Sequence, residues 1–178
     1  MKRNIILLGA GLLFIATYFY SCSLLDVEKE FWLEHTFIVQ GNNATFDEDY
    51  LMDAASESDV INEYADLIKS IEILETTYEV TYHNGTPTQQ INTATLTVSA
   101  SSGGGPEVIG TVTNQNLASL LNNVQTLAVN QAGVDRAANL IKNAPHSFLL
   151  NLAGSANETP LDFKVKFRFK VKMVANPT

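Results

Sequence analysis

Residues 163–173 read Phe-Lys-Val-Lys-Phe-Arg-Phe-Lys-Val-Lys-Met. Every odd position is apolar and every even position is basic. Because successive side chains of a strand point to opposite faces, this stretch predicts a long strand with one face in the core and one basic face. A strand with one solvated face is typical of an antiparallel sheet.

Other stretches with β patterns extend this prediction. They indicate strands at residues 30–40, 75–82, 93–100, 108–112 and 148–152. Asn84-Gly85-Thr86-Pro87 predicts a hairpin between the second and third of these strands. The Gly-rich segment 101–106 predicts a hairpin tip between the third and fourth, and residues 154–160 are expected to form a turn.

Helical spacing of apolar residues occurs in three places. It predicts helices at residues 57–69, 114–128 and 134–143, the last of which stops at Pro145. Ser56 and Asp59 resemble a capping box at the start of the first helix. Residues 44–56 are expected to be irregular or to form a short acidic helix.

Together these patterns define a fold class. Strands outnumber helices, and no internal repeat or long linker divides the chain. We expect a mainly β or α+β fold, an antiparallel β-sandwich-like domain with two or three inserted amphipathic helices. We recognise no family for this globular part.

The N-terminal segment has a different composition. Lys2 and Arg3 precede an apolar run, and no charged residue follows until Asp26. Cys22, the only cysteine of the chain, closes the run. A basic start, an apolar centre and a small residue before the cut are typical of a secretory signal.

This segment resembles the type II (lipobox) signal peptide of bacterial lipoproteins. Ser21 before Cys22 matches that family, whereas Phe19 and Tyr20 replace its usual leucine and small residue. The resemblance implies three segments: a removed signal peptide (1–21), a lipidated cysteine with its tether (22–29) and a single globular β-rich domain (30–178). The alternative is an uncleaved signal anchor, because the uncharged run is long enough to cross a bilayer.

The charge balance limits the partners of the mature chain. Without residues 1–21 it has nine basic and nineteen acidic residues, a formal charge of −10. Nucleic acid and anionic headgroups repel such a chain, so lipid on Cys22 is expected to hold it at the membrane. If Cys22 is lipidated, no thiol remains for a disulfide, for catalysis or for a metal.

Two hypotheses account for the basic residues of the alternating stretch. The first is a docking face for an acidic partner or a polysaccharide, formed by Lys164, Lys166, Arg168, Lys170 and Lys172. The second, which we favour, is internal pairing with glutamates on neighbouring strands. The candidates for such pairing are Glu30, Glu34, Glu72, Glu75 and Glu79. If the strand lies at an edge of the sheet, lysines also discourage aggregation there.

The remaining candidate sites are weak. The acidic segment 47–66 is rich in calcium-type oxygen ligands, but it lacks EF-hand spacing, and a solvated face is the favoured interpretation. His35, His83 and His146 are not at metal-ligand spacing. The sequence contains no nucleophile elbow and no phosphate-binding loop. We therefore expect no metal, no cofactor and no enzymatic activity.

These observations lead to an expectation about function. We expect a non-catalytic accessory or adaptor subunit of an outer-membrane protein complex. It is anchored in the bacterial cell envelope through Cys22 and faces either the periplasm or the exterior. Other envelope proteins, and not nucleic acid, are the expected partners. The alternative is a binding lipoprotein for an apolar ligand or a glycan, with a cavity between sheet and helices.

Overall fold

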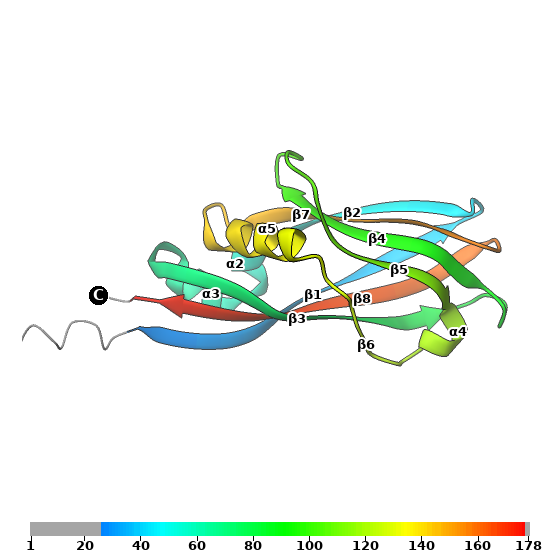
Figure 1. Cartoon of the computed structure of the whole chain (residues 1–178), viewed down its shortest axis with the longest axis horizontal. Coiled ribbons are helices and arrows are strands. Elements are labelled where there is room, and N and C mark those ends of the chain that lie inside the picture. The colour runs from blue at the N-terminus through cyan, green and yellow to red at the C-terminus, as the bar shows by residue number, and fades with distance from the viewer. Residues whose placement is uncertain (1–25, 177–178) are drawn as a thin grey trace, which may run out of the picture.

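The structure, a computed structural model, describes residues 26–176, and its two antiparallel sheets pack face to face as a β-sandwich (Figure 1). In chain order the elements are β1 (Val27–Gly41), β2 (Thr45–Asp53), α2 (Ala54–Glu57), α3 (Asp59–Tyr64), the 3-10 helix η2 (Ala65–Leu67), β3 (Ile68–His83), β4 (Gln90–Ala100), β5 (Glu107–Asn116), α4 (Leu117–Leu120), β6 (Gln125–Thr126), α5 (Gln131–Lys142), β7 (Ser147–Ala156) and β8 (Leu161–Ala175).

Each sheet has four strands. Sheet A has the order β1-β8-β3-β6, and sheet B has the order β2-β7-β4-β5. The strand pairings within both sheets are antiparallel. The predicted fold class, an antiparallel β-sandwich with a few inserted helices, is confirmed.

Strand β8 behaves as its alternating sequence predicts. From Leu161 to Ala175 its residues are alternately buried and half-buried, and the apolar ones face the core. The aromatic rings among them meet rings from both sheets: Phe167 lies edge-on to Phe37 of β1 at 6.0 Å, and Phe163 lies edge-on to Phe46 of β2 at 5.7 Å. Such contacts add to the area burial that holds the two sheets together. The strand lies inside sheet A and not at its edge.

The chain crosses between the sheets at the first predicted hairpin, so that prediction is wrong. Strand β3 pairs with β8 and β6 in sheet A, whereas β4 pairs with β5 and β7 in sheet B. The turn residues after His83 serve a crossover instead, in which the Gln89 N–H donates to the Thr86 carbonyl at 3.1 Å. The second predicted hairpin, between β4 and β5, is confirmed. Its tip turns at Gly103, which has a φ of 84°.

Two further segments differ from their predictions. Residues 45–53 form strand β2, whose Phe46 and Met52 are buried although three of its five exposed positions are acidic. The helix predicted at 114–128 is only the short α4, and β5 continues to Asn116 before it. Leu117, Leu120 and Leu127 are buried as expected of an apolar face, but the chain between them is mostly extended. Tertiary burial therefore overrides helical spacing here.

Helices fill the end of the sandwich where β1 begins (Figure 1). Helix α5 confirms its prediction, since Val134, Ala137 and Ile141 are buried and it packs against β3 of sheet A and β5 of sheet B. The other predicted helix is split into α2, α3 and η2, and β3 begins already at Ile68. Asp53 caps the N-terminus of α2 by accepting hydrogen bonds from two backbone N–H groups, in place of the predicted Ser56–Asp59 capping box. Within residues 26–176 no helix is long and apolar enough to cross a membrane.

Candidate functional site

The basic side chains of β8 line the outer face of sheet A. We call Lys164, Lys166, Arg168, Lys170 and Lys172 the basic ladder. Because β8 lies between β1 and β3, the ladder has neighbours on both sides. Four of its members meet carboxylates: Lys166 meets Glu79 at 3.8 Å, Arg168 meets Glu34 at 3.2 Å, Lys170 meets Glu30 at 2.8 Å and Lys172 meets Glu28 at 3.1 Å.

Internal pairing is therefore confirmed for Lys166, Arg168 and Lys170, each with a glutamate that the sequence suggested. Lys172 pairs with Glu28 instead. Glu28 lies in the segment expected to be a tether, but strand β1 begins as early as Val27 and includes it. The other two suggested glutamates lie opposite the ladder in the register of β3 and act on it through their charge. Glutamates from both sides thus neutralise four of the five cations of the ladder.

Two of the ladder lysines and one of their glutamates have pKa values shifted in favour of the charged forms. The hydrogen bond from Lys170, and then its charge, lower the pKa of Glu30. The same contact raises the pKa of Lys170, and the hydrogen bond to Glu28 raises the pKa of Lys172. These charges are near water, so each pair contributes little to stability on its own.

Two members of the ladder are held differently. The Arg168 Nε lies near Glu34 but makes no directed hydrogen bond, so this contact is an attraction between charges. Lys164 has its Nζ 5.7 Å from the centre of the Tyr82 ring, a cation–π contact. Tyr82 in turn donates to Asp162 at 3.2 Å.

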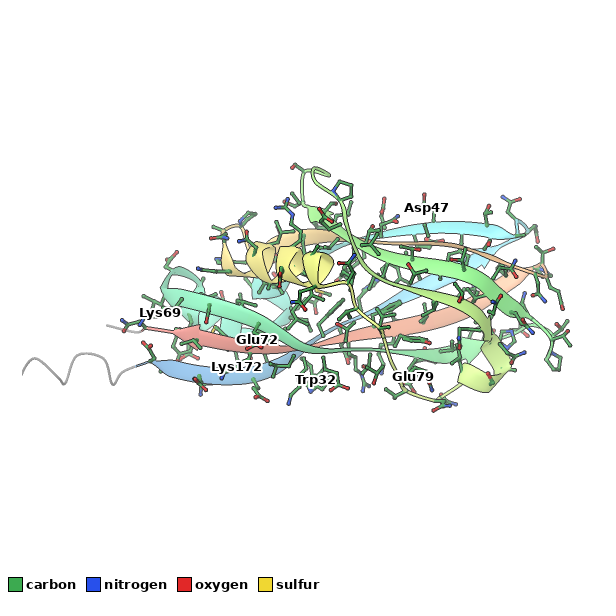
Figure 2. All side chains as sticks on the ribbon, in the orientation of Figure 1. Trp32, Asp47, Lys69, Glu72, Glu79 and Lys172 are labelled. Atoms are coloured by element: carbon green, nitrogen blue, oxygen red, sulfur yellow. The ribbon has the colours of Figure 1, made fainter. Side chains whose placement is uncertain are left out.

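Large apolar side chains are exposed among these charges. Trp32 lies opposite Lys170, and both Ile38 and Tyr82 lie opposite Lys164. Val124 directly precedes β6, the edge strand that pairs with β3 in sheet A. We call these the outer apolar set: Trp32 (45% exposed), Ile38 (53%), Tyr82 (40%) and Val124 (50%). In Figure 2, Trp32, Glu79 and Lys172 lie along the same side of the molecule, opposite Asp47 on sheet B.

The outer face of sheet B is different. Its β4 positions are Thr93, Thr95 and Thr97, and Thr95 shares a 3.1 Å hydroxyl contact with Thr111 of β5. Exposed leucine is found at Leu51 on the edge strand β2. Small hydroxyl side chains on a sheet face are ordinary for a solvated surface, so we assign no site there.

The three histidines lie in separate places and have structural contacts. His35 stacks on Tyr50 with ring centres 3.4 Å apart, and burial lowers the pKa of its imidazole. His83 contacts Gln89 at 2.9 Å, and the buried His146 contacts the carbonyl of Ile141 at 2.8 Å. Among the described residues no group of histidine, cysteine and carboxylate side chains has the geometry of a metal site.

The acidic segment 47–66 is spread over β2 and the helices that follow it. Asp47 and Asp49 both accept from the amide of Asn151 on β7, and Asp53 caps α2. Glu57 accepts from the Tyr50 hydroxyl at 2.8 Å. Carboxylates of this segment therefore have structural roles as hydrogen-bond acceptors, which the sequence pattern did not predict.

A polar network ties together the loops at the end of the sandwich far from the start of β1. Its centre is Gln89, which is only 1% exposed and donates from Nε2 to the carbonyls of Glu158 and Pro160, both at 3.0 Å. Asp162 accepts from Gln40 and Asn84, and these hydrogen bonds lower the pKa of its carboxyl group. No local sequence pattern predicts this network, because its members come from loops far apart in the chain.

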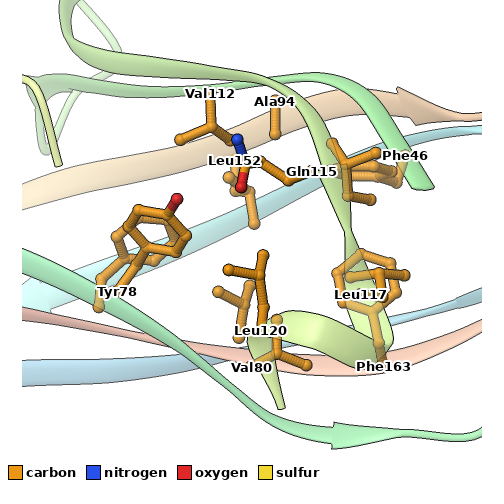
Figure 3. A pocket seen from close by; sticks show the side chains of 13 residues that line it. Phe46, Tyr78, Val80, Ala94, Val112, Gln115, Leu117, Leu120, Leu152 and Phe163 are labelled. Carbon is orange, nitrogen blue, oxygen red and sulfur yellow. The ribbon is translucent and has the colours of Figure 1, made fainter. Parts of the chain in front are cut away.

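An apolar cavity lies between the sheets, and it is small. It is lined by Phe46, Tyr78, Val80, Ile91, Ala94, Val112, Gln115, Leu117, Leu120, Leu152, Phe163, Val165 and Phe167 (Figure 3). Its free volume is about 30 Å³, which is enough for one water molecule. Ligand pockets are usually about 300–1,000 Å³.

Comparisons with known proteins do not place the chain in a family. No protein-family model matches it, and no curated protein does. Among solved structures, a chain of turnip yellow mosaic virus is similar at a TM-score of 0.38, with 10% identity over 86% of this chain and 82% of that chain. The BFDV capsid protein gives a TM-score of 0.40, with 7% identity over 83% of this chain and 98% of that chain. Similarity at this level implies no shared function.

Proposed function

We propose that this chain is a lipid-anchored protein of the bacterial cell envelope whose domain is a non-catalytic adaptor, docking another envelope protein on the outer face of sheet A. The anchor is the Cys22 lipid implied by the N-terminal signal, which lies outside the described residues. The adaptor role concerns the domain that follows.

The observation that carries the adaptor role is the outer apolar set within a neutralised ladder. Protein interfaces are enriched in aromatic side chains and arginine, and they place their polar groups mainly at a solvent-accessible rim. The outer face of sheet A offers Trp32, Ile38, Tyr82 and Arg168 in this manner. Its paired charges favour a protein surface of mixed polarity over a strongly charged polymer.

The small cavity argues against the apolar-ligand alternative, because one water molecule fills it. The glycan alternative has one point in its favour. Trp32 and Tyr82 are exposed rings on the same sheet face as the proposed docking surface. Sugar rings stack on such side chains, so the experiment below also tests a glycan.

Anchoring is tested by the intact mass of the protein extracted from membranes. We expect the loss of residues 1–21 and the added mass of acyl chains. Cys22→Ser is expected to abolish both processing and acylation. A full-length mass with a free thiol would show a signal anchor instead.

Docking is tested with a photoreactive residue placed at Trp32 or at Tyr82, and at Leu51 of sheet B as the matched control. Leu51 is 54% exposed, comparable to Trp32 at 45%. We expect the first two positions to cross-link to the same envelope protein in intact cells, and the control position not to. The double variant Trp32→Ser, Ile38→Ser is expected to lose that partner while its thermal unfolding stays cooperative. Equal cross-linking at Leu51 would reject the docking face, and retention on a polysaccharide column without any protein adduct would favour the glycan.

A further inference from the structure

We infer that the end of the sandwich where β1 begins lies against the lipid headgroups, and that the long axis of the domain rises away from the membrane. This inference rests on the proposed acylation of Cys22. It assigns the membrane-facing surface, which the proposed function leaves open.

Three strand ends meet at this end of the domain. Val27 and Ile68, the first residues of β1 and β3, both pair with Ala175, the last residue of β8. Asp26 forms an ion pair with Lys69 at 2.5 Å, which ties the start of the described chain to β3. Figure 2 shows Lys69 at the extreme end of the molecule.

The chain between anchor and domain is short. Four residue steps separate Cys22 from Asp26, so the two Cα atoms are at most about 14 Å apart. Strand β1 alone has 15 residues and spans about 47 Å at the rise of a β-strand. A domain so much longer than its tether keeps its tether end near the headgroups in every orientation.

The charge distribution gives neither flat orientation an attraction to the headgroups, so the short tether decides which part of the domain lies nearest to them. The described residues have nine basic against nineteen acidic side chains, and four of the five ladder cations are already paired. Laying the domain on its side brings one sheet face to the headgroups. Sheet B carries Asp47 and Asp49 near its edge, and sheet A carries the glutamates of the ladder. Lys164, the remaining ladder cation, lies over the Tyr82 ring, so neither face offers a cluster of unpaired cations among the described residues that a phosphate surface attracts.

The test uses the full lipidated chain in vesicles of phosphatidylcholine that contain a lipid with a nitroxide on its headgroup. The single cysteine is consumed by the lipid, so an engineered cysteine is the only thiol available for a fluorescent label. Ser70→Cys places the label beside the tether end, and Asn43→Cys places it in the turn after β1 at the other end; both positions are exposed. We expect quenching several-fold stronger at residue 70 than at residue 43.

A second pair of chains serves as the control for the tether. They carry a Gly/Ser insert of about 20 residues, with an average span of about 25 Å, between Leu25 and Asp26. Quenching at residue 70 is expected to fall toward that at residue 43. Equal quenching at both sites in acylated protein would mean that the domain lies flat, which overturns this inference and the exposed docking face. Protein that lacks acyl mass would overturn the proposed anchor together with this inference.

Discussion

Lys170 lies opposite Trp32 in the register of sheet A, yet its Nζ reaches diagonally along the strand to Glu30 at 2.8 Å. Lys172 leans in the same direction, toward Glu28. The two lysine side chains therefore point toward the start of β1. Strand β8, inside sheet A, thus holds Glu28 and Glu30 of the edge strand β1 in ion pairs.

Glu30→Gln tests this pairing through pH. The pKa of Glu30 is lowered from 4.5 by Lys170, so the folded state binds its proton less tightly than the unfolded state. The stability from this carboxylate is fully present above pH 4.5 and is lost as the pH falls through the lowered folded value. We expect the variant to be less stable than the wild type at neutral pH and the difference in urea midpoint to vanish in acid. A matched control is Glu107→Gln, an exposed carboxylate that forms no ion pair with another residue of the described range 26–176. A difference that persists in strong acid would contradict the pairing.

His35 provides a second pH-dependent contribution. Burial lowers the pKa of its imidazole from 6.5, so the folded state favours the neutral ring stacked on Tyr50. The stability from this preference is present above pH 6.5 and is lost as the pH falls through the lowered folded value. In the variant His35→Phe, this loss of stability between neutral pH and the lowered pKa is expected to be absent. Urea unfolding of both proteins across this range measures it, and an identical decline in both would reject the assignment to His35.

Gly133 permits the close approach of α5 to β5. A Cβ atom at this position would lie 2.1 Å from the carbonyl oxygen of Val108. Since backbone atoms cannot yield, Gly133→Ala must displace the helix, and we expect a loss of about 1–3 kcal/mol in the free energy of unfolding. Gly104→Ala in the β4–β5 tip is the control, because a Cβ there meets nothing within 4 Å. Equal unfolding midpoints of the two variants would contradict this packing.

A chain that ends after Leu161 lacks most of β8 and is expected not to fold. Both β1 and β3 lose their shared neighbour, and Phe163, Phe167 and Phe169 leave the core. Circular dichroism during urea titration is expected to show no cooperative transition. A chain that ends after Asn176 keeps all of β8 and serves as the control. A cooperative transition in the shorter chain would show that β8 is dispensable.

The sequence predicted the structure best for elements in which burial of one continuous face governs every residue. In β8 each apolar residue faces the core and each basic one faces outward, so alternation reports the structure directly. Helix α5 likewise buries one continuous face. The internal pairing of the ladder was predictable because an acidic chain supplies glutamates next to any basic strand.

Other elements could not be predicted because distant residues decide them. The turn residues between β3 and β4 suit a hairpin and a crossover equally, and only pairing with β8 and β7 distinguishes the two. Strand β2 was missed because its inward residues are few among its acidic ones. The outer apolar set comes from β1, β3 and the segment before β6, and no local pattern brings these together.

The position of β8 has a consequence for the order of events in folding. It is the last strand of the chain, yet it provides the pairing partner for the first strand, over a hundred residues earlier. Contacts of such long range fold slowly, because the loop must close before any pairing repays its entropy. A chain that emerges N-terminus first cannot complete sheet A until residues 161–175 are free. The first strand therefore waits for the last one, and the sandwich is completed only when the C-terminal strand joins it.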